Sequence, residues 1–385
     1  MRVGIRNVVL VGALAAATPA FAGWDEGVAA FKAKNYPQAA REFEAVSKDR
    51  PDWAGGFLML GRTQLLMDRT SDAVNTLRKA YDLDPSGVET QLALAQAYLG
   101  ANRASEASQL LGKINAAGLP KERQSLYQQL VAKAASESGQ TDRAASALEK
   151  AAAAAPNDPT VQFNYGVLAL NAGDTGKAVA ALEKSVRLDG SDAGRQKVLV
   201  QALLRQGRET AGAQKDVIYT RAAEVARSMV AKSAIYDHLL LLGEAQLGAN
   251  QYDAAVATFG QAAAKNAGEW LPGFYAGQAQ TALARYGDAE NSLRKALQSA
   301  TTTADKARIW RQLGFVYEKQ RNFEQAKTAY RSAGDNAAIT RVEENQKIAD
   351  HNKTAEEEEK RLAELKRQQE ILREQLQGAP PPPRP

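Results

Sequence analysis

Two short strings of this sequence carry residue types that can do chemistry. Gly173 to Lys177 ends like a phosphate-binding loop, in which glycine amides and a lysine hold phosphate groups. However, Asn171 stands where that loop needs its first glycine, and Ala178 stands where it needs a magnesium-binding Ser or Thr. Ser292 to Lys295 has the S-x-x-K spacing of some acyl-transfer enzymes, but Thr76 to Lys79 occupies the same phase of another repeat. The strings predict a turn and a helix period rather than a catalytic centre.

The remaining titratable residues predict no catalytic or metal site. His238 and His351 are the two histidines of the chain, neither has a metal-ligand partner at i+3 or i+4, and the sequence contains no cysteine. Zinc sites need such ligands, and a histidine-based triad needs a positioned imidazole. The acidic run Glu356 to Glu359 is typical of a solvated helix face. We therefore expect a protein that is not an enzyme and holds no cofactor and no metal.

The elements that would position any binding residue repeat along the chain. Gly27 and Gly61 are 34 residues apart, as are Ala39, Ala73 and Ala107. A fixed period in this range indicates stacked supersecondary units. Alanine is abundant, aromatic residues make up 6% of the chain, and no stretch alternates Val, Ile and Thr as a strand would. The pattern predicts an all-α protein.

Residues 307–333 show the predicted unit most clearly. Trp310, Leu313, Gly314 and Tyr317 follow the i, i+3, i+4, i+7 spacing of one helical stripe. A second stripe begins at Ala326 after a short break. Small residues such as Gly314 let two helices approach closely. Each period therefore predicts a pair of helices joined by a turn.

This unit resembles the tetratricopeptide repeat family, whose pattern W-x2-L-G-x2-Y is matched by Trp310 to Tyr317 and continued by Ala326-x3-Tyr330. The resemblance implies a right-handed α-solenoid of about nine helix-turn-helix repeats over residues 23–340. The expected units begin near residues 23, 54, 88, 125, 159, 193, 236, 270 and 307. Three-residue insertions before Ala144 and before Ala326 are expected in the loops between units.

The sixth expected unit departs from the pattern. Residues 207–214 lengthen the turn before its second helix. Three interpretations are open from the sequence: an irregular repeat, which we favour, a hinge, or a decorated loop that carries function.

The N-terminus predicts export. Arg2 and Arg6 precede an apolar stretch, and Ala20-Phe21-Ala22 supplies a small-x-small cleavage site. Residues 1–22 are therefore expected to be a signal peptide cleaved after Ala22, which predicts a periplasmic or secreted protein without a transmembrane segment in the mature chain. Removing Arg2 and Arg6 lowers the formal charge from +5 to +3. A nucleic-acid-binding protein would show a concentrated basic face, and the repeats contain no Lys/Arg-rich cluster.

The C-terminus predicts a separate charged helix over residues 341–377. A short heptad pattern with Gln369 at an a position has leucines at its a and d positions: Leu362, Leu365, Leu372 and Leu376. The stretch is interpreted either as a single solvated helix or as a short coiled coil that forms a homodimer or docks on a partner. Residues 378–385 are expected to be a proline-rich disordered tail.

The family resemblance also implies where a ligand would bind, because the first helices of successive repeats line the concave side of such a solenoid. Residues carried over to this groove are polar, with scattered cations and a few apolar residues, which suits an extended peptide. The candidate groove residues are Arg62, Gln96, Lys133, Asn171, Gln201, Arg205, Glu244, Phe274, Gln278, Arg308, Arg311 and Phe315.

We expect a non-catalytic scaffold or adaptor that binds other proteins or extended peptides, in cell-envelope assembly or secretion. Two alternatives stay open: a peptidoglycan- or carbohydrate-associated binding protein, and a noncatalytic subunit of an envelope enzyme complex. Sugars stack on aromatic rings, and the groove set holds only Phe274 and Phe315, so protein binding is favoured.

Overall fold

The computed structural model describes residues 23–377, which form nineteen α-helices and one short 3-10 helix, with no strand. The predicted signal peptide (1–22) and proline-rich tail (378–385) lie outside the described residues. Within residues 23–377 no helix is long and apolar enough to span a membrane.

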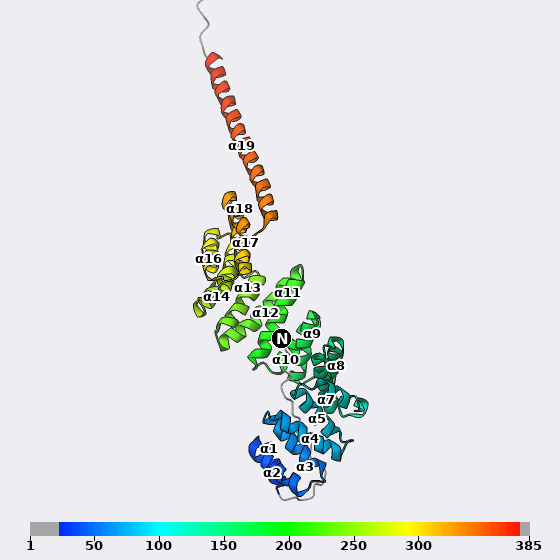
Figure 1. The fold of residues 1–385 in the computed structure, drawn as a ribbon. Coiled ribbons are helices and arrows are strands. Elements are labelled where there is room, and N and C mark those ends of the chain that lie inside the picture. The colour runs from blue at the N-terminus through cyan, green and yellow to red at the C-terminus, as the bar shows by residue number, and fades with distance from the viewer. Residues whose placement is uncertain (1–22, 378–385) are drawn as a thin grey trace, which may run out of the picture. The chain divides into compact units, whose positions relative to one another are not determined.

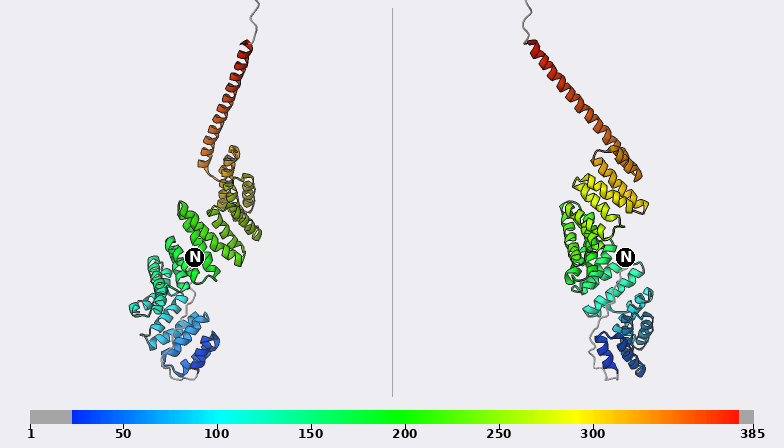
Figure 2. Two further views of the ribbon diagram at one scale, coloured as in Figure 1. Left: turned by 180° about the vertical axis from the view of Figure 1, so that it is seen from behind. Right: turned by 90° about the vertical axis from the view of Figure 1, so that its left-hand side faces the viewer.

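The chain divides into two compact units at residues 211 and 212. In each unit successive helices pack against one another as hairpins (Figures 1 and 2). Unit 1 contains α1 (Trp24–Lys32), α2 (Tyr36–Asp49), α3 (Ala54–Leu66), α4 (Thr70–Leu83), α5 (Val88–Gly100), α6 (Ala104–Leu111), η1 (Ala116–Gly118), α7 (Lys121–Glu137), α8 (Thr141–Ala154), α9 (Pro159–Asn171), α10 (Thr175–Leu188) and α11 (Ala193–Glu209). Unit 2 contains α12 (Ala213–Lys232), α13 (Tyr236–Gly248), α14 (Tyr252–Lys265), α15 (Leu271–Ala282), α16 (Tyr286–Ser299), α17 (Thr303–Lys319), α18 (Phe323–Ser332) and α19 (Asn336–Gln377).

A single contact recurs inside the hairpins and explains the repeated glycines. A Cβ added at Gly314 would lie 2.8 Å from the Tyr330 ring, and one added at Gly61 would lie 2.4 Å from the Leu77 side chain. In both hairpins the large partner stands sixteen residues after the glycine. The same spacing joins Gly27 to Phe43, Gly166 to Leu182, Gly243 to Phe259 and Gly277 to Leu293. The predicted role of Gly314 in close helix approach is thus confirmed, since each large side chain fills the place of a missing side chain.

The turns inside the hairpins also recur at the repeat period. Residues with positive φ follow the first helices at Lys34, Asp68, Asn102, Gly139, Gly173, Asn250, Ala284 and Arg321. The steps from Asn102 to Gly139 and from Ala284 to Arg321 are 37 residues rather than 34, as the predicted insertions require. The insertions do not lie wholly in loops, however, because α7 and α17 each have 17 residues where α3 has 13. Both helices start four residues before the expected start of their repeat, so part of each insertion is helical.

The sixth expected unit is where the two compact units meet along the sequence. Its first helix, α11, packs against α10 in unit 1, and its second helix, α12, packs against α13 in unit 2. Val200 occupies the place of the hairpin glycine, and Asp216 stands sixteen residues later. This unit therefore lacks the glycine and the large side chain that six other hairpins share.

The last helix, α19, begins at Asn336, five residues before the predicted charged segment. Ala338 and Val342 are buried in the core formed by α15 to α18, so the first turns of α19 complete the last repeat. Beyond them the helix runs on past the last hairpin as one straight rod (Figures 1 and 2). The predicted long charged helix is present, with its N-terminal turns serving as part of the solenoid core.

The Glu318 side chain of α17 connects α17 to α18 and to the first turns of α19. It accepts hydrogen bonds from the Tyr330 hydroxyl of α18 (3.0 Å), and from Arg341 (2.9 Å) and Asn345 (3.0 Å) of α19. Burial acts to raise the pKa of Glu318, but these hydrogen bonds and the charge of Arg341 outweigh it and hold that pKa below its ordinary value. The carboxylate is therefore stabilised in its charged form where three helices meet.

Candidate functional site

In unit 1 two of the inward-facing cations belong to an ion network. Glu89 of α5 pairs with Arg62 of α3 and with Arg123 of α7, on first helices of three successive repeats. The arginine side chains are 13% and 16% exposed. Because both guanidinium groups share one carboxylate, Arg62 serves to tie neighbouring repeats together.

Arg205 of α11 is also engaged within unit 1. It donates hydrogen bonds to the Leu170 carbonyl of α9 (2.9 Å) and to Glu209 (2.9 Å). The hydrogen bond from Arg205 is the largest influence that lowers the pKa of Glu209. This cation therefore connects α9 to α11, two first helices that lie in contact.

The other predicted residues of unit 1 line the same series of helices. Gln96 of α5, Lys133 of α7 and Gln201 of α11 are half-buried, and Asn171, the last residue of α9, is exposed. Amide side chains in such positions can both donate and accept hydrogen bonds with a peptide backbone. Unit 1 thus presents a polar face on which Arg62 and Arg205 bind to other groups of the same unit.

Unit 2 presents a different combination on its first helices. The Arg308 guanidinium of α17 lies over the rings of Trp270 (5.3 Å) and Phe274 (5.2 Å), which flank the start of α15. Phe274 is 5% exposed and packs in the core, so its ring does not offer an open face as the sequence predicted. Trp270 is half-buried, so its ring is more accessible to a ligand than the ring of Phe274. Arginine over a tryptophan face is a favourable cation–π arrangement.

Further along α17 the exposed side chains continue the same stripe. Arg311 forms an ion pair with Asp335 (3.0 Å), and Lys319 lies over the Phe315 ring (5.1 Å). Phe315 is 38% exposed, so part of its ring can contact a ligand. We call Trp270, Arg308, Arg311, Phe315 and Lys319 the cation–aromatic face of unit 2. Arg308, Arg311, Phe315 and Lys319 follow i, i+3, i+7, i+11 and share one side of α17.

Two further predicted residues, Glu244 of α13 and Gln278 of α15, are half-buried on the neighbouring first helices. α13 contacts α15, and α15 contacts α17, so the first helices of unit 2 follow one another directly. The predicted residues of unit 2 therefore lie on three adjacent helices.

Three residues that form the ion network of unit 1 or contact Arg308 in unit 2 were not identified from the sequence: Glu89, Arg123 and Trp270. The sequence signal for the first two was obscured by the insertion between their repeats. Glu89 and Arg123 carry opposite charges 34 residues apart, but the step between these two repeats is 37 residues, so Arg123 lies about one helical turn before the position equivalent to Glu89. Trp270 precedes α15 and lies just outside the inward positions that the family pattern supplies.

The strings that resembled catalytic motifs have structural roles. Asp174 caps α10 by accepting a hydrogen bond from the Lys177 amide (3.0 Å), and Gly173 takes a positive φ of 86° in the hairpin turn. His238 is 8% exposed, and its Nδ1 lies 2.8 Å from the Ser233 carbonyl. Across residues 23–377 no cluster of three or more His, Cys, Asp or Glu side chains could hold a metal ion.

Family models of the tetratricopeptide repeat match residues 64–134 and 132–193 in unit 1 and residues 307–333, the hairpin of α17 and α18, in unit 2. The chain is a tetratricopeptide repeat (TPR) protein. No curated protein matches it at a significant level.

Solved structures resemble this TPR protein in fold. PilW, a widely conserved type IV pilus biogenesis factor, aligns over 55% of this chain and 91% of its own, with 18% identity and a TM-score of 0.47. PilF of Pseudomonas aeruginosa aligns over 62% of this chain and 99% of its own, with 21% identity and a TM-score of 0.44. In the APC/C hetero-tetramer Cut9–Hcn1 the alignment covers 79% of this chain and 59% of that chain, with 15% identity and a TM-score of 0.40. At these identities the likenesses say nothing about partners.

Membership of the TPR family gives the class of function. Stacked helix pairs of this kind form extended surfaces that hold other proteins or peptides, and they are typically non-catalytic scaffolds. No catalytic family is among the matching models.

Proposed function

We propose that this TPR protein is a non-catalytic scaffold of the bacterial cell envelope that binds an extended peptide segment on the cation–aromatic face of unit 2. The observation that carries the proposal is the exposed stripe of α17, in which Arg308, Arg311 and Lys319 share one side of the helix with the exposed Phe315 and Lys319 lies over its ring. An exposed ring beside cations can offer a ligand both an apolar contact and charge-assisted hydrogen bonds.

The chemistry of the face defines the peptide. Three cations on one side of a helix attract carboxylates, and Phe315 and Trp270 offer apolar surface for one side chain of the ligand. Arg311 already holds a carboxylate, Asp335, which indicates the geometry that an acidic ligand residue would use. We therefore propose an acidic peptide that carries at least one apolar residue.

The test is a double charge reversal, Arg308→Glu with Arg311→Glu. Partners of the full chain are captured by in-cell crosslinking in envelope fractions and identified by mass spectrometry, and the affinity of the identified segment is then measured by calorimetry. We expect the double variant to bind at least about 30-fold more weakly, since two charge-assisted contacts become repulsive.

A matched control is available in the same unit. Lys295→Glu with Arg331→Glu changes the charge by the same amount at exposed positions on the second helices α16 and α18. This control should bind normally. Equal loss in both double variants would mean that net charge, not the cation–aromatic face, attracts the partner.

The proposed location rests on the N-terminal sequence. An export signal with cleavage after Ala22 predicts a mature chain that begins at Gly23 in the periplasm or outside the cell. The mass of the mature protein from fractionated cells tests this, since a chain that retains Met1 in the cytoplasm would contradict it. Recovery of cell-wall fragments alone in the capture experiment would favour the carbohydrate-binding alternative. Capture of an enzyme that needs residues 341–385 for activity would favour the enzyme-subunit alternative.

A further inference from the structure

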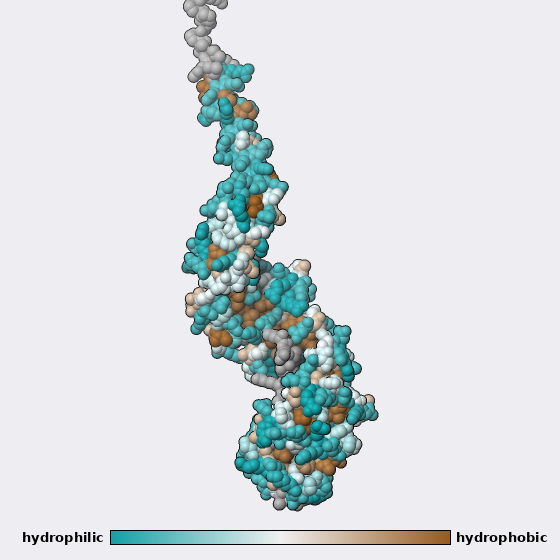
Figure 3. Space-filling model, in the orientation of Figure 1, coloured by the Kyte–Doolittle hydropathy of each residue, from teal (hydrophilic) through white to brown (hydrophobic). Residues whose placement is uncertain are grey.

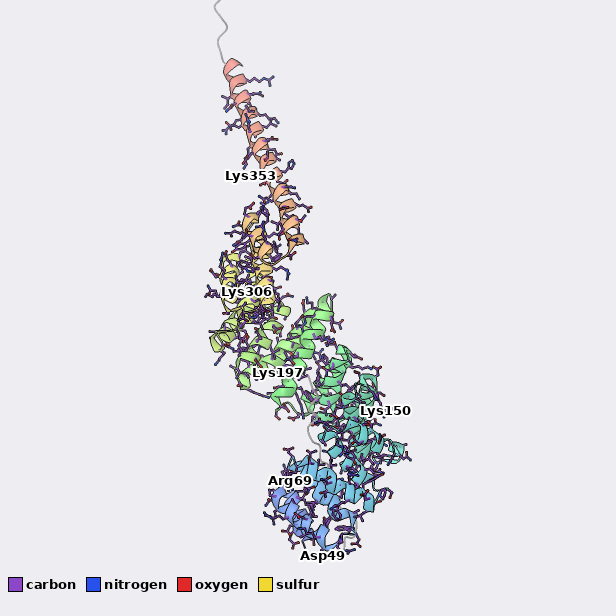
Figure 4. All side chains as sticks on the ribbon, in the orientation of Figure 1. Asp49, Arg69, Lys150, Lys197, Lys306 and Lys353 are labelled. Atoms are coloured by element: carbon purple, nitrogen blue, oxygen red, sulfur yellow. The ribbon has the colours of Figure 1, made fainter. Side chains whose placement is uncertain are left out.

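The outer part of α19 is a helix without a packing partner within the described chain. Every residue from 350 to 371 is exposed. Figure 3 shows this stretch as largely hydrophilic with separate hydrophobic residues, and Figure 4 shows its side chains, Lys353 among them, pointing away from the helix. Within this stretch Lys353 and Glu357 form an ion pair at 4.0 Å along the helix. A long polar helix gains little stability from such pairs alone, since most helical stability comes from packing.

The exposed apolar residues of this stretch nevertheless follow a pattern. Ile348, Leu362 and Leu365 are 60%, 55% and 48% exposed. Ile348, Ala355 and Leu362 are spaced by seven residues, and Leu365 stands three residues further. These residues occupy a, a, a and d of one heptad frame and form a narrow seam along one side of the helix. A seam of this kind fits a second helix.

We infer that α19 pairs in antiparallel orientation with α19 of a second copy of this chain. The charges beside the seam exclude the parallel arrangement. In the same heptad frame Glu358 is at d, Arg361 at g and Lys366 at e. Parallel pairing would place Glu358 against itself in the seam and Arg361 beside the second copy's Lys366, which are repulsive contacts.

Antiparallel pairing turns these contacts into favourable ones. When Leu362 lies opposite the second copy's Leu365, the symmetry of the pair repeats this apolar layer twice. The next layer outward then joins Glu358 to the second copy's Gln369, whose amide can donate a hydrogen bond to the carboxylate. Each of these layers thus pairs side chains that attract or pack against each other.

The flanking e positions add opposite charges in the same alignment. Glu359 lies beside the second copy's Lys366, and this pair also occurs twice. The charge along the helix agrees with this orientation. Residues 343–359 contain seven acidic and two basic side chains, a net charge of −5, whereas residues 360–373 contain two acidic and five basic ones, a net charge of +3. Parallel pairing would set each of these stretches against its own copy.

The first test measures association of the full chain by sedimentation velocity at about 5 to 200 µM. We expect a reversible dimer whose dissociation constant rises at least about 100-fold in the double variant Leu362→Glu, Leu365→Glu, because four leucines per dimer lose their burial. Ile371→Glu is the matched control, since Ile371 is also 48% exposed but lies at a c position away from the seam. A chain that stays monomeric throughout, a dimer that survives the double variant, or equal loss with Ile371→Glu would overturn the inference.

The second test determines orientation and uses the absence of native cysteine. Chains carrying Glu358→Cys are mixed with chains carrying Gln369→Cys and oxidised. Antiparallel pairing predicts a mixed disulfide, whereas parallel pairing keeps these positions eleven residues, about 16 Å, apart. Ala355→Cys alone should not form a disulfide between copies, because its counterpart lies at the far end of the pair. Self-linking of Ala355→Cys without the mixed disulfide would establish a parallel pair and overturn the proposed orientation.

The inference is independent of the proposed ligand. The Arg308→Glu, Arg311→Glu variant lies outside the seam and should dimerise normally. Loss of peptide binding with an intact dimer, or the reverse, would separate the two proposals.

Discussion

The two units engage the candidate arginines of their first helices differently. In unit 1 Arg62 shares Glu89 with Arg123, and Arg205 donates a hydrogen bond to a carbonyl of the preceding first helix. In unit 2 Arg311 pairs with Asp335, but Arg308 lies over the Trp270 ring, and Phe315 stays exposed beneath Lys319.

The difference shows that a place on a first helix does not by itself decide whether a cation is available to a ligand. Arg62 and Arg308 were both candidates from the sequence, but a carboxylate on the next repeat makes Arg62 a structural residue. Arg308 has only aromatic surface beneath it, and this leaves its donors available to a carboxylate from outside. Stability is therefore expected to depend on the inward face of unit 1, and binding on that of unit 2.

The largest effect should come from filling the hairpin glycines. Gly314→Leu places a side chain where the Tyr330 ring lies, and Gly61→Leu does the same against Leu77. Each should destabilise its own unit by about 3 kcal/mol or more through overpacking. Hydrogen exchange should show loss of protection in unit 2 for Gly314→Leu and in unit 1 for Gly61→Leu, with partner binding lost in the first variant alone.

Gly287→Leu is the control for this experiment, since nothing lies within 4 Å of a Cβ added at Gly287. Unchanged thermal unfolding of Gly314→Leu would refute the assigned phase of the repeats. Loss of binding in Gly61→Leu but not in Gly314→Leu would reverse the comparison and move the site to unit 1.

A smaller effect is expected from Glu89→Gln in unit 1. The change leaves the mostly buried Arg62 and Arg123 without their shared charge, so the free energy of unfolding of unit 1 should fall by about 1–3 kcal/mol. Glu44→Gln, which breaks an exposed pair with Lys48 in the same unit, should leave that free energy nearly unchanged. Chemical denaturation measures both, and binding of the partner should be normal in each. A partner that binds Glu89→Gln more tightly would show that the released arginines can serve as a site.

The smallest effect concerns Glu318 and depends on pH. Its pKa in the folded protein is held below the ordinary 4.5, so the charged form contributes stability above pH 4.5 that is lost as the pH falls through the folded pKa. At neutral pH Glu318→Gln should destabilise the α17–α19 junction by about 1 kcal/mol. Below pH 4.5 the difference between the natural chain and the variant should shrink, as measured by urea unfolding and by exchange in the first turns of α19. A difference that stays constant from pH 7 to 3 would contradict the assigned role of the carboxylate.

Much of the architecture could be predicted from the sequence because its determinants are local and periodic. Gly314 and Tyr330 form their contact inside one hairpin, and the positive-φ turns at Asn102 and Gly139 reproduce the predicted insertion. The division of the chain after Ala211 was not predicted, although Val200 and Asp216 stand where other hairpins have a glycine and a large side chain.

The candidate site was less predictable because it depends on contacts between repeats. Phe274 was assigned to the groove by its position, but packing against α16 and α17 buries it. Arg62 was assigned as free to bind, but the carboxylate that holds it lies 27 residues away on another helix. A pattern within one repeat carries no information on such neighbours.

The sixteen-residue spacing between each hairpin glycine and its large partner has a consequence for how the protein is made. Both halves of this contact are present as soon as a single repeat has been synthesised, and the next repeat adds only neighbouring contacts. Contacts close in sequence form quickly, since little chain entropy is lost in bringing them together. The repeats can therefore fold one after another as they are synthesised, because none of these contacts requires a segment that is distant in sequence.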